Sequence, residues 1–328
     1  MRKSFYVDNC VTNLPDHNAL RLFMKKATEV FADAKFELRG WEYSDPDLEG
    51  PANTAVLGLS WDKKEDTLAV VNMSVVKDGV ITRRTILSVA HRLFDPIGFT
   101  CPVSVCPKLL LQQCWALKGE WDEEVPDDVR KGFLRWLQDL PLLQEVKIPR
   151  WLMGVSERVL SCSLHTFCDA SKMAYAAAVF IRFEYSSCVQ VQLIQTKSRV
   201  APVKAVTIPR LELWAATIGT RLATSIVKEL EQKDIAQFFW SDSSAMIAWI
   251  KRDDQWGVFV WNRVHEIQNL TSKESWRNVP GIMNPADLPS RGCTVHQLIQ
   301  SRWWEGTDWL KLPAQDWPSR EPSQMRKL

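Results

Sequence analysis

The second half of the chain alternates strand-like and helical segments in an order that few folds share. Three β-rich runs follow one another from Ser161, and a long helical pattern then extends from about Pro209 to Leu230. A fourth strand, two helical segments and a further strand precede the sequence NPADLPSRG. This order predicts an α/β fold in which a mixed sheet carries helices on its faces.

Four acidic residues stand at the joints of this pattern. Asp169 and Asp242 end predicted strands, Glu212 lies in the first turn of the long helix, and Asp287 lies beside a proline turn. Carboxylates that converge from separate elements can hold two divalent ions roughly 3.5–4 Å apart across a phosphate. Each acid alone has an ordinary structural explanation, such as a helix cap or a turn. Together they predict a site for two Mg²⁺ or Mn²⁺ ions.

The first half predicts a smaller sheet followed by helices. An amphipathic helix spans His17 to Phe36, and we expect it to cover a small sheet. The expected strands are FELRGWEYS, TAVLGLSWD and DTLAVVNMSV. The expected helices are RRTILSVAHRLF, KLLLQQCWALK and VRKGFLRWLQDL, with a proline-rich bend at FDPIGFTCPVSVCP between the first two. Pro126 followed by two aspartates is typical of a helix start.

Charge and composition exclude little about the partner. The 41 Lys and Arg nearly balance the 39 Asp and Glu, so any surface that binds nucleic acid must be a local patch. Basic residues that could contact phosphates precede Glu212, and solvated surface charge explains them equally well. They are Lys197, Arg199, Lys204 and Arg210.

The eight cysteines form no C-x-x-C pair, which argues against a structural zinc site and favours reduced thiols. The N-terminus has no signal-peptide core, and no run of 18 or more apolar residues occurs. We therefore expect an intracellular protein, by default cytoplasmic, without a membrane span.

The order and context of the four acids resemble an RNase H domain. That resemblance implies that Asp169 binds both ions, that Glu212 and Asp242 complete the site, and that Asp287 holds the second ion weakly. The substrate would be the RNA strand of an RNA/DNA hybrid. Many such domains carry a His in the loop before the last Asp, whereas the corresponding loop here, NVPGIMNPAD, has none.

The N-terminal sequence FYVDN resembles the YVDD box of reverse transcriptases. Tyr6 and Asp8 match that box, whereas Asn9 replaces its second acid, and an amide is a poorer Mg²⁺ ligand than a carboxylate. The other palm aspartate of that family would lie upstream of Met1. The resemblance therefore implies a vestigial motif and no polymerase activity from this chain alone.

Motifs along almost the whole chain resemble Pol polyproteins of BEL/Pao-type LTR retrotransposons, sometimes labelled Pao retrotransposon peptidases. They include LGLSWDKKEDTL, TRRTILSVAHRLFDPIGFTCPVSV, IPRLEL, NPADLPSRG and WWEGTDWL. By this resemblance, residues 1–80 are a partial reverse-transcriptase palm, 81–150 a helical thumb or connection, and 155–300 an RNase H-like domain. Residues 301–328 would be a Trp-rich linker towards an integrase.

The resemblance leaves the activity open between two hypotheses. The first is a retroelement fragment whose RNase H-like domain cuts RNA/DNA hybrids, alone or with remaining Pol segments such as the fingers and integrase. The second is an inactive or co-opted remnant that binds nucleic acid or protein. No Asp-Thr-Gly or Asp-Ser-Gly triplet occurs, so we assign no protease role.

Overall fold

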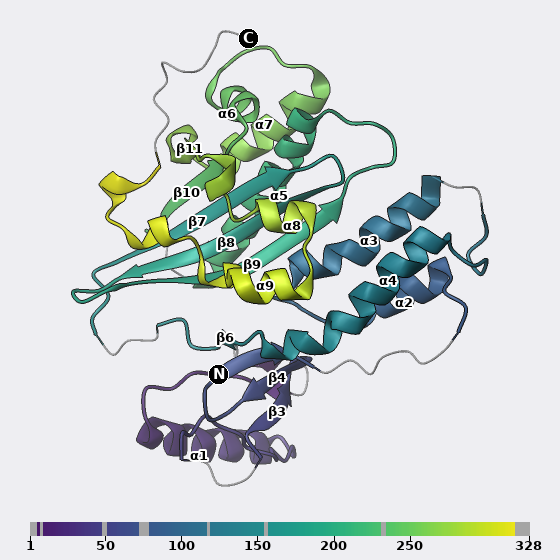
Figure 1. Cartoon of the computed structure of the whole chain (residues 1–328). Coiled ribbons are helices and arrows are strands. Elements are labelled where there is room, and N and C mark those ends of the chain that lie inside the picture. The colour runs from purple at the N-terminus through teal and green to yellow at the C-terminus, as the bar shows by residue number, and fades with distance from the viewer. Residues whose placement is uncertain are drawn as a thin grey trace.

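A five-stranded mixed sheet forms the centre of the molecule (Figure 1). The computed structural model describes residues 5–6, 9–47, 51–71, 79–116, 119–153, 157–230 and 234–318. The sheet order is β11-β10-β7-β8-β9, in which β10 runs parallel to β7 and β11, and β7, β8 and β9 are antiparallel. The strands are β7 Ser161–Ala170, β8 Ala174–Glu184, β9 Val189–Val200, β10 Ala236–Ser241 and β11 Trp276–Asn278. The predicted α/β fold with a mixed sheet is confirmed.

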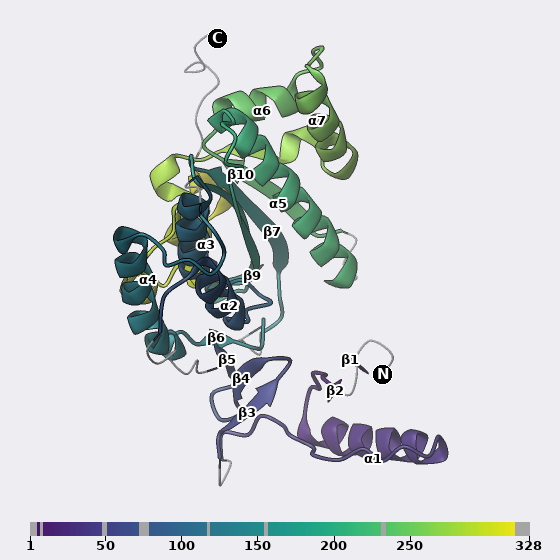
Figure 2. The ribbon, with the colours of Figure 1, turned by 90° about the vertical axis from the view of Figure 1, so that its right-hand side faces the viewer.

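Helices cover both faces of this sheet (Figure 2). On one face lie α5 Ile208–Leu230, α6 Ser244–Lys251 and α7 Val258–Leu270; on the other lie α3 Cys101–Ala116 and α8 Asp287–Arg291. Successive side chains of β7 point to opposite faces of the sheet. Leu164 and Cys168 pack towards α5, whereas Phe167 packs on the opposite side. Burial on both faces explains why the inner strand β8 is almost continuously apolar.

Helices α2 Arg83–Arg92, α3 and α4 Asp127–Asp139 form the predicted helical module. Pro126 precedes α4, and Asp127 and Asp128 occupy its first turn, as predicted. The expected proline-rich bend is wrong in its second half, because α3 already begins at Cys101 and contains Pro107. Proline has no N–H to donate to the carbonyl four residues earlier. Here the Val103 carbonyl accepts from Trp136 Nε1 at 3.0 Å instead, so a tertiary contact satisfies it.

The smaller sheet has the order β3-β4-β5-β6. Its strands are β3 Asn53–Val56, β4 Leu59–Asp62, β5 Thr67–Val70 and β6 Ile148–Pro149. TAVLGLSWD was expected as one strand but forms a hairpin, because Leu57 and Gly58 both adopt positive φ (48° and 82°), as a tight two-residue turn requires. FELRGWEYS forms no strand. The end of DTLAVVNMSV lies outside the described residues.

The first helix, α1 His17–Asp33, forms as predicted but does not cover the small sheet. Ala27 is its single buried residue, and Figure 2 shows the helix beside the sheet. Its Phe23 ring meets Trp41 edge-on at 6.3 Å, so the helix packs against the irregular chain that follows it. A cavity of about 680 Å³ is lined by both α1 and β3.

The N-terminal hairpin pairs β1 Phe5–Tyr6 with β2 Asn9–Cys10, and Tyr6 lies opposite Asn9. The predicted hairpin is therefore present, with Asn9 inside the second strand. Asp8 lies outside the described residues, so its place in the vestigial motif stays a prediction.

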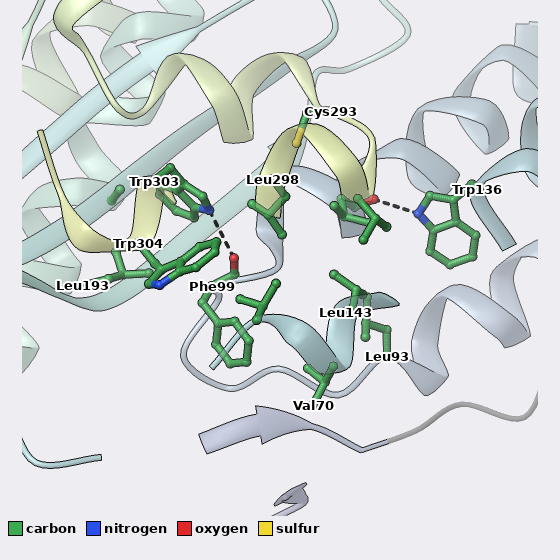
Figure 3. Packing of buried hydrophobic residues seen from close by; sticks show 14 of the residues in the cluster. Val70, Leu93, Phe99, Trp136, Leu143, Leu193, Cys293, Leu298, Trp303 and Trp304 are labelled. Carbon is green, nitrogen blue, oxygen red and sulfur yellow. Dashed lines mark hydrogen bonds between the residues drawn. The ribbon is translucent and has the colours of Figure 1, made fainter. Parts of the chain in front are cut away.

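The tryptophan-rich tail packs onto the sheet as far as Trp317, and its interpretation as a linker stays a prediction. Trp303 and Trp304 are buried in the same cluster as Phe99 and Leu193 (Figure 3). Trp303 Nε1 donates to the Phe99 carbonyl at 3.3 Å. The tail contains α9 Val295–Ser301 and the short 3₁₀ helices Trp303–Glu305, Asp308–Lys311 and Ala314–Asp316. Further 3₁₀ helices span Leu140–Glu145, Lys273–Ser275 and Gly281–Met283.

The tail, the helical module and one face of the large sheet thus share a single hydrophobic cluster. The proposed domain boundaries near residues 150 and 300 stay predictions. No helix in the described ranges is both long and apolar enough to cross a membrane.

Candidate metal centre

Three carboxylates meet at one edge of the large sheet. Asp169 lies near the end of β7, Asp242 directly follows β10, and Glu212 projects from α5. One carboxylate oxygen from each lies within 4.8 Å of the other two. Parallel pairing of β7 with β10 explains part of this geometry, because the carboxyl ends of parallel neighbours reach the same sheet edge. Helix α5 packs across β7 and β8 and so brings the third carboxylate, that of Glu212, to the same edge.

The buried Glu212 carboxylate has one satisfied oxygen and one without a partner. Its Oε1 accepts from the Ala170 backbone N–H at 3.1 Å. Its Oε2 is buried and has no hydrogen-bond partner among the described residues. A buried carboxylate oxygen left unpaired is costly, and a divalent cation shared with Asp169 and Asp242 would satisfy it. Oxygen-only donors of this kind suit Mg²⁺ or Mn²⁺.

The electrostatics of the cluster favour a cation as well. Burial, and after it the neighbouring charges of Asp169 and Asp242, raise the pKa of Glu212 to about 9. Burial likewise raises the pKa of Asp169 to about 6, against the opposing hydrogen bond from Ser290. Clustered carboxyl groups with raised pKa values indicate a site where nearby positive charges do not balance the negative charge of the ionised acids.

Asp287, the fourth predicted ligand, begins α8 but does not belong to this group. Its carboxylate accepts a hydrogen bond from Arg291 Nε, one helical turn further on. It still lies close enough to Asp169 to raise that residue's pKa. The structure therefore brings together three of the four predicted acids and leaves Asp287 in an ion pair at the rim.

The four predicted basic residues are all exposed. Lys197 and Arg199 are two residues apart on the edge strand β9, so they share one face of it. The Arg210 guanidinium lies over the Phe259 ring at 5.2 Å. Within the described ranges none of the four, Lys204 included, forms an ion pair. Their role in binding nucleic acid stays a prediction.

No histidine in the described part of the chain belongs to the acidic group. His265 stacks on Trp261 at 5.7 Å, and His296 faces Asp139 at 3.9 Å. The loop that lacks the histidine approaches Asp242 closely at Gly281, where an added Cβ would lie 2.8 Å from Asp242 Oδ2. A side chain at position 281 would therefore displace a ligand of the proposed ion.

Sequence reasoning missed two residues that hold this centre in place. The Ser290 hydroxyl, fully buried, donates to Asp169 Oδ2. The Asn284 side-chain amide donates to the Cys168 carbonyl at 3.0 Å, which ties the loop before α8 to β7. Both lie in NPADLPSRG, but Asp169 is 121 positions from Ser290, and Cys168 is 116 positions from Asn284. Nothing local in the sequence indicates those contacts.

Ser290→Ala is expected to weaken divalent-ion binding by roughly 10–100-fold, the usual effect of removing a hydrogen bond that orients a metal ligand. Mn²⁺ titration calorimetry would measure it. Ser301→Ala is the matched control, because Ser301 donates only to the Leu298 carbonyl in α9. An affinity within twofold of the wild type would show that Ser290 does not orient Asp169.

A known protein family matches part of the chain. Residues 82–243 match the family described as the Pao retrotransposon-like RNaseH-like domain. The match begins in the helical module and ends one residue after Asp242, so it includes three of the four predicted acids. No curated protein matches the chain.

Several solved structures resemble the chain. The N-terminal RNase H domain of Rv2228c from Mycobacterium tuberculosis, fused to maltose-binding protein, is 14% identical, with a TM-score of 0.30 over 43% of this chain and 99% of that one. LC11-RNase H1 in complex with an RNA/DNA hybrid is 11% identical, with a TM-score of 0.28 over 39% and 91%. The foamy viral protease-reverse transcriptase in complex with dsDNA is 11% identical, with a TM-score of 0.42 over 83% and 53%. This chain thus spans about half of the foamy viral protein.

The family match and the observed sheet support a retroelement protein with an RNase H-like domain.

Proposed function

We propose that this chain is a divalent-metal-dependent nuclease that hydrolyses the RNA strand of RNA/DNA hybrids. The observation that carries the proposal is the group of Asp169, Glu212 and Asp242, in which a buried Glu212 oxygen lacks any partner among the described residues. The match to an RNaseH-like family over residues 82–243 supports the same chemistry. The chain would be part of a BEL/Pao-type Pol polyprotein, with residues 1–80 as a partial palm that does not polymerise.

The chain's own residues would prepare the site before substrate arrives. Asp169, Glu212 and Asp242 would hold the Mg²⁺ or Mn²⁺ ions, and Asp287 would join them for a second ion. Bound ions of this kind lower the pKa of an attacking water and stabilise the leaving oxygen. Ser290 fixes the orientation of Asp169, and the Ala170 N–H fixes one oxygen of Glu212. No protein proton shuttle is assigned, since no described histidine lies in the group.

The substrate would lie across the sheet edge on the side of the basic residues. Lys197, Arg199, Lys204 and Arg210 are exposed and free of ion pairs in the described ranges, which suits contacts with phosphates. Preference for RNA in the cleaved strand would come from contacts with its 2′-hydroxyls.

The test is cleavage of an end-labelled RNA/DNA hybrid by the purified full chain. With Mg²⁺ or Mn²⁺ we expect cuts in the RNA strand, no cuts in a DNA duplex of the same sequence, and complete loss of cleavage in EDTA. A protein that binds the hybrid with steep salt dependence but never cuts it under any divalent ion would contradict the proposal. That outcome would favour the co-opted binding remnant.

A further inference from the structure

The ion pair between Asp287 and Arg291 lies near the acidic group, close enough for both charges to act on Asp169. Arg291 Nε donates to Asp287 Oδ1 across one turn of α8. Neither side chain is buried, with 64% of Arg291 and 39% of Asp287 exposed. Arg291 therefore supplies the positive charge that Asp287 contacts, and both side chains are accessible to ligands from solution.

Arg291 lies within electrostatic reach of the whole acidic group. Its charge lowers the pKa of Asp169 and of Glu212, in opposition to burial. Asp169 and Asp242 in turn raise the pKa of Arg291, after the larger effect of Asp287. The adjacent Ser290 donates to Asp169 and so fixes α8 against the acids. Arg291 cannot move far from the site while this contact holds.

We propose that Arg291 occupies Asp287 in place of a second divalent ion and releases it when the phosphate backbone of a nucleic acid binds. This inference rests on the proposed function and deepens it. A guanidinium and a metal ion compete for the same carboxylate, and a second divalent ion would repel Arg291. A phosphodiester can accept two parallel hydrogen bonds from Arg291, whereas Asp287 accepts one, from Nε. Binding of the second ion and of the nucleic acid would then favour each other.

The proposal predicts effects of opposite sign from one substitution. Removing the guanidinium frees Asp287, so Arg291→Gln should bind the second ion about fivefold to tenfold more tightly in the absence of nucleic acid. The same variant loses a phosphate contact, so its affinity for a hybrid in EDTA should fall by about threefold to tenfold. Its salt dependence should also decrease, by about one in the slope of log K against log salt.

Two titrations of the full chain at pH 7.5 measure these effects without any cleavage. Mn²⁺ calorimetry reports the two ion affinities, and fluorescence anisotropy of a labelled RNA/DNA hybrid in EDTA reports nucleic-acid binding. Arg302→Gln is the matched control, because Arg302 pairs with Glu305 one turn away at nearly the same exposure, 67% and 40%. It should behave as the wild type in both titrations.

Each outcome decides the proposal. Opposite shifts in Arg291→Gln, absent from Arg302→Gln, support it, since a merely structural role would weaken both affinities together. Unchanged affinities, shifts of the same sign, or two equally tight ions in the wild type without nucleic acid overturn it. Should Arg291→Gln fail to fold, Asp287→Asn replaces it. That variant should lose the second ion and keep its hybrid affinity in EDTA, and loss of both or of neither overturns the proposal.

Hybrid cleavage separates this inference from the proposed function. Opposite shifts in a protein that cuts no hybrid would keep the inference and reject the nuclease. Metal-dependent cleavage without the opposite shifts would keep the nuclease and reject the inference.

Discussion

Asp242→Asn is expected to lower the rate of hybrid cleavage by at least roughly 10²–10³-fold, the loss typical when one group that stabilises developing charge is removed. Asp242 completes the three-carboxylate group from β10. An amide keeps the shape of the side chain but removes its charge, and it is a weaker ligand for a hard cation. Single-turnover cleavage of labelled hybrid at saturating Mg²⁺ measures the loss.

Asp308→Asn is the control for that loss, because Asp308 is 98% exposed and pairs with Lys311, with no place in the acidic group. It should cleave at the wild-type rate. Thermal unfolding of both variants checks that they fold. Cleavage by Asp242→Asn at more than a tenth of the wild-type rate would remove Asp242 from the catalytic site.

Glu212→Gln is expected to abolish metal-dependent cleavage and yet stabilise the metal-free protein at pH 8 by on the order of 2–5 kcal/mol. Burial beside two other acids raises the pKa of Glu212 from 4.5 to about 9, so at pH 8 the metal-free protein folds with this carboxyl mostly protonated. Each unit of such a shift corresponds to about 1.4 kcal/mol. Glutamine keeps the oxygen that accepts from Ala170 and adds N–H donors for the oxygens nearby. The substitution thus removes a cost that only a bound cation otherwise offsets.

The pH dependence follows from the sign of this shift. Between pH 4.5 and about 9 the folded protein retains the Glu212 proton, whereas the unfolded chain releases it. The unfolded state therefore binds fewer protons, and the stability of the metal-free protein falls as pH rises through this window. The pKa of Asp169 is raised from 3.8 to about 6, so this residue adds a further loss of stability as pH rises between those two values. Glu212→Gln should lack most of the fall above pH 6.

Urea unfolding in EDTA at pH 5 and pH 8, for wild type and Glu212→Gln, measures both effects. The variant's advantage should be small at pH 5 and large at pH 8, and Mg²⁺ should stabilise the wild type far more than the variant. Equal stability of the two proteins at pH 8 would mean that Glu212 is not held among uncompensated charges. Such a trade between stability and activity is common where ligands are gathered for function.

The order of elements in the large sheet was predictable from local patterns. Alternating or β-rich runs gave the positions of β7, β8, β9 and β10, and helical periodicity gave α5, because these signals lie within about a dozen neighbouring residues. Polar residues at strand ends predicted where Asp169 and Asp242 would lie. Parallel pairing of β7 with β10, which the structure shows, then brings these two strand ends to the same sheet edge.

Other features depended on partners distant in sequence, and prediction failed there. The start of α3 at Cys101 contradicted the proline signal, because Trp136 satisfies the carbonyl that Pro107 leaves free. The packing of the tryptophan-rich tail was not predicted either, since Trp303 is buried against the helical module and the sheet. The exposure of α1 beside the small sheet was also not predicted, since an amphipathic pattern does not indicate which surface the apolar face of a helix packs against.

The sequence by itself determined the α/β class of the large sheet, the strands and helix that position Asp169, Glu212 and Asp242, and the absence of any long apolar run. These properties depend on backbone preferences and side-chain periodicity over short stretches of chain. Only the tertiary structure decided that Asp169, Glu212 and Asp242 share one small volume while Asp287 pairs with Arg291, and that Ser290 orients the first of them. Distances of a few ångströms between elements tens of residues or more apart are set by packing, which no local pattern encodes.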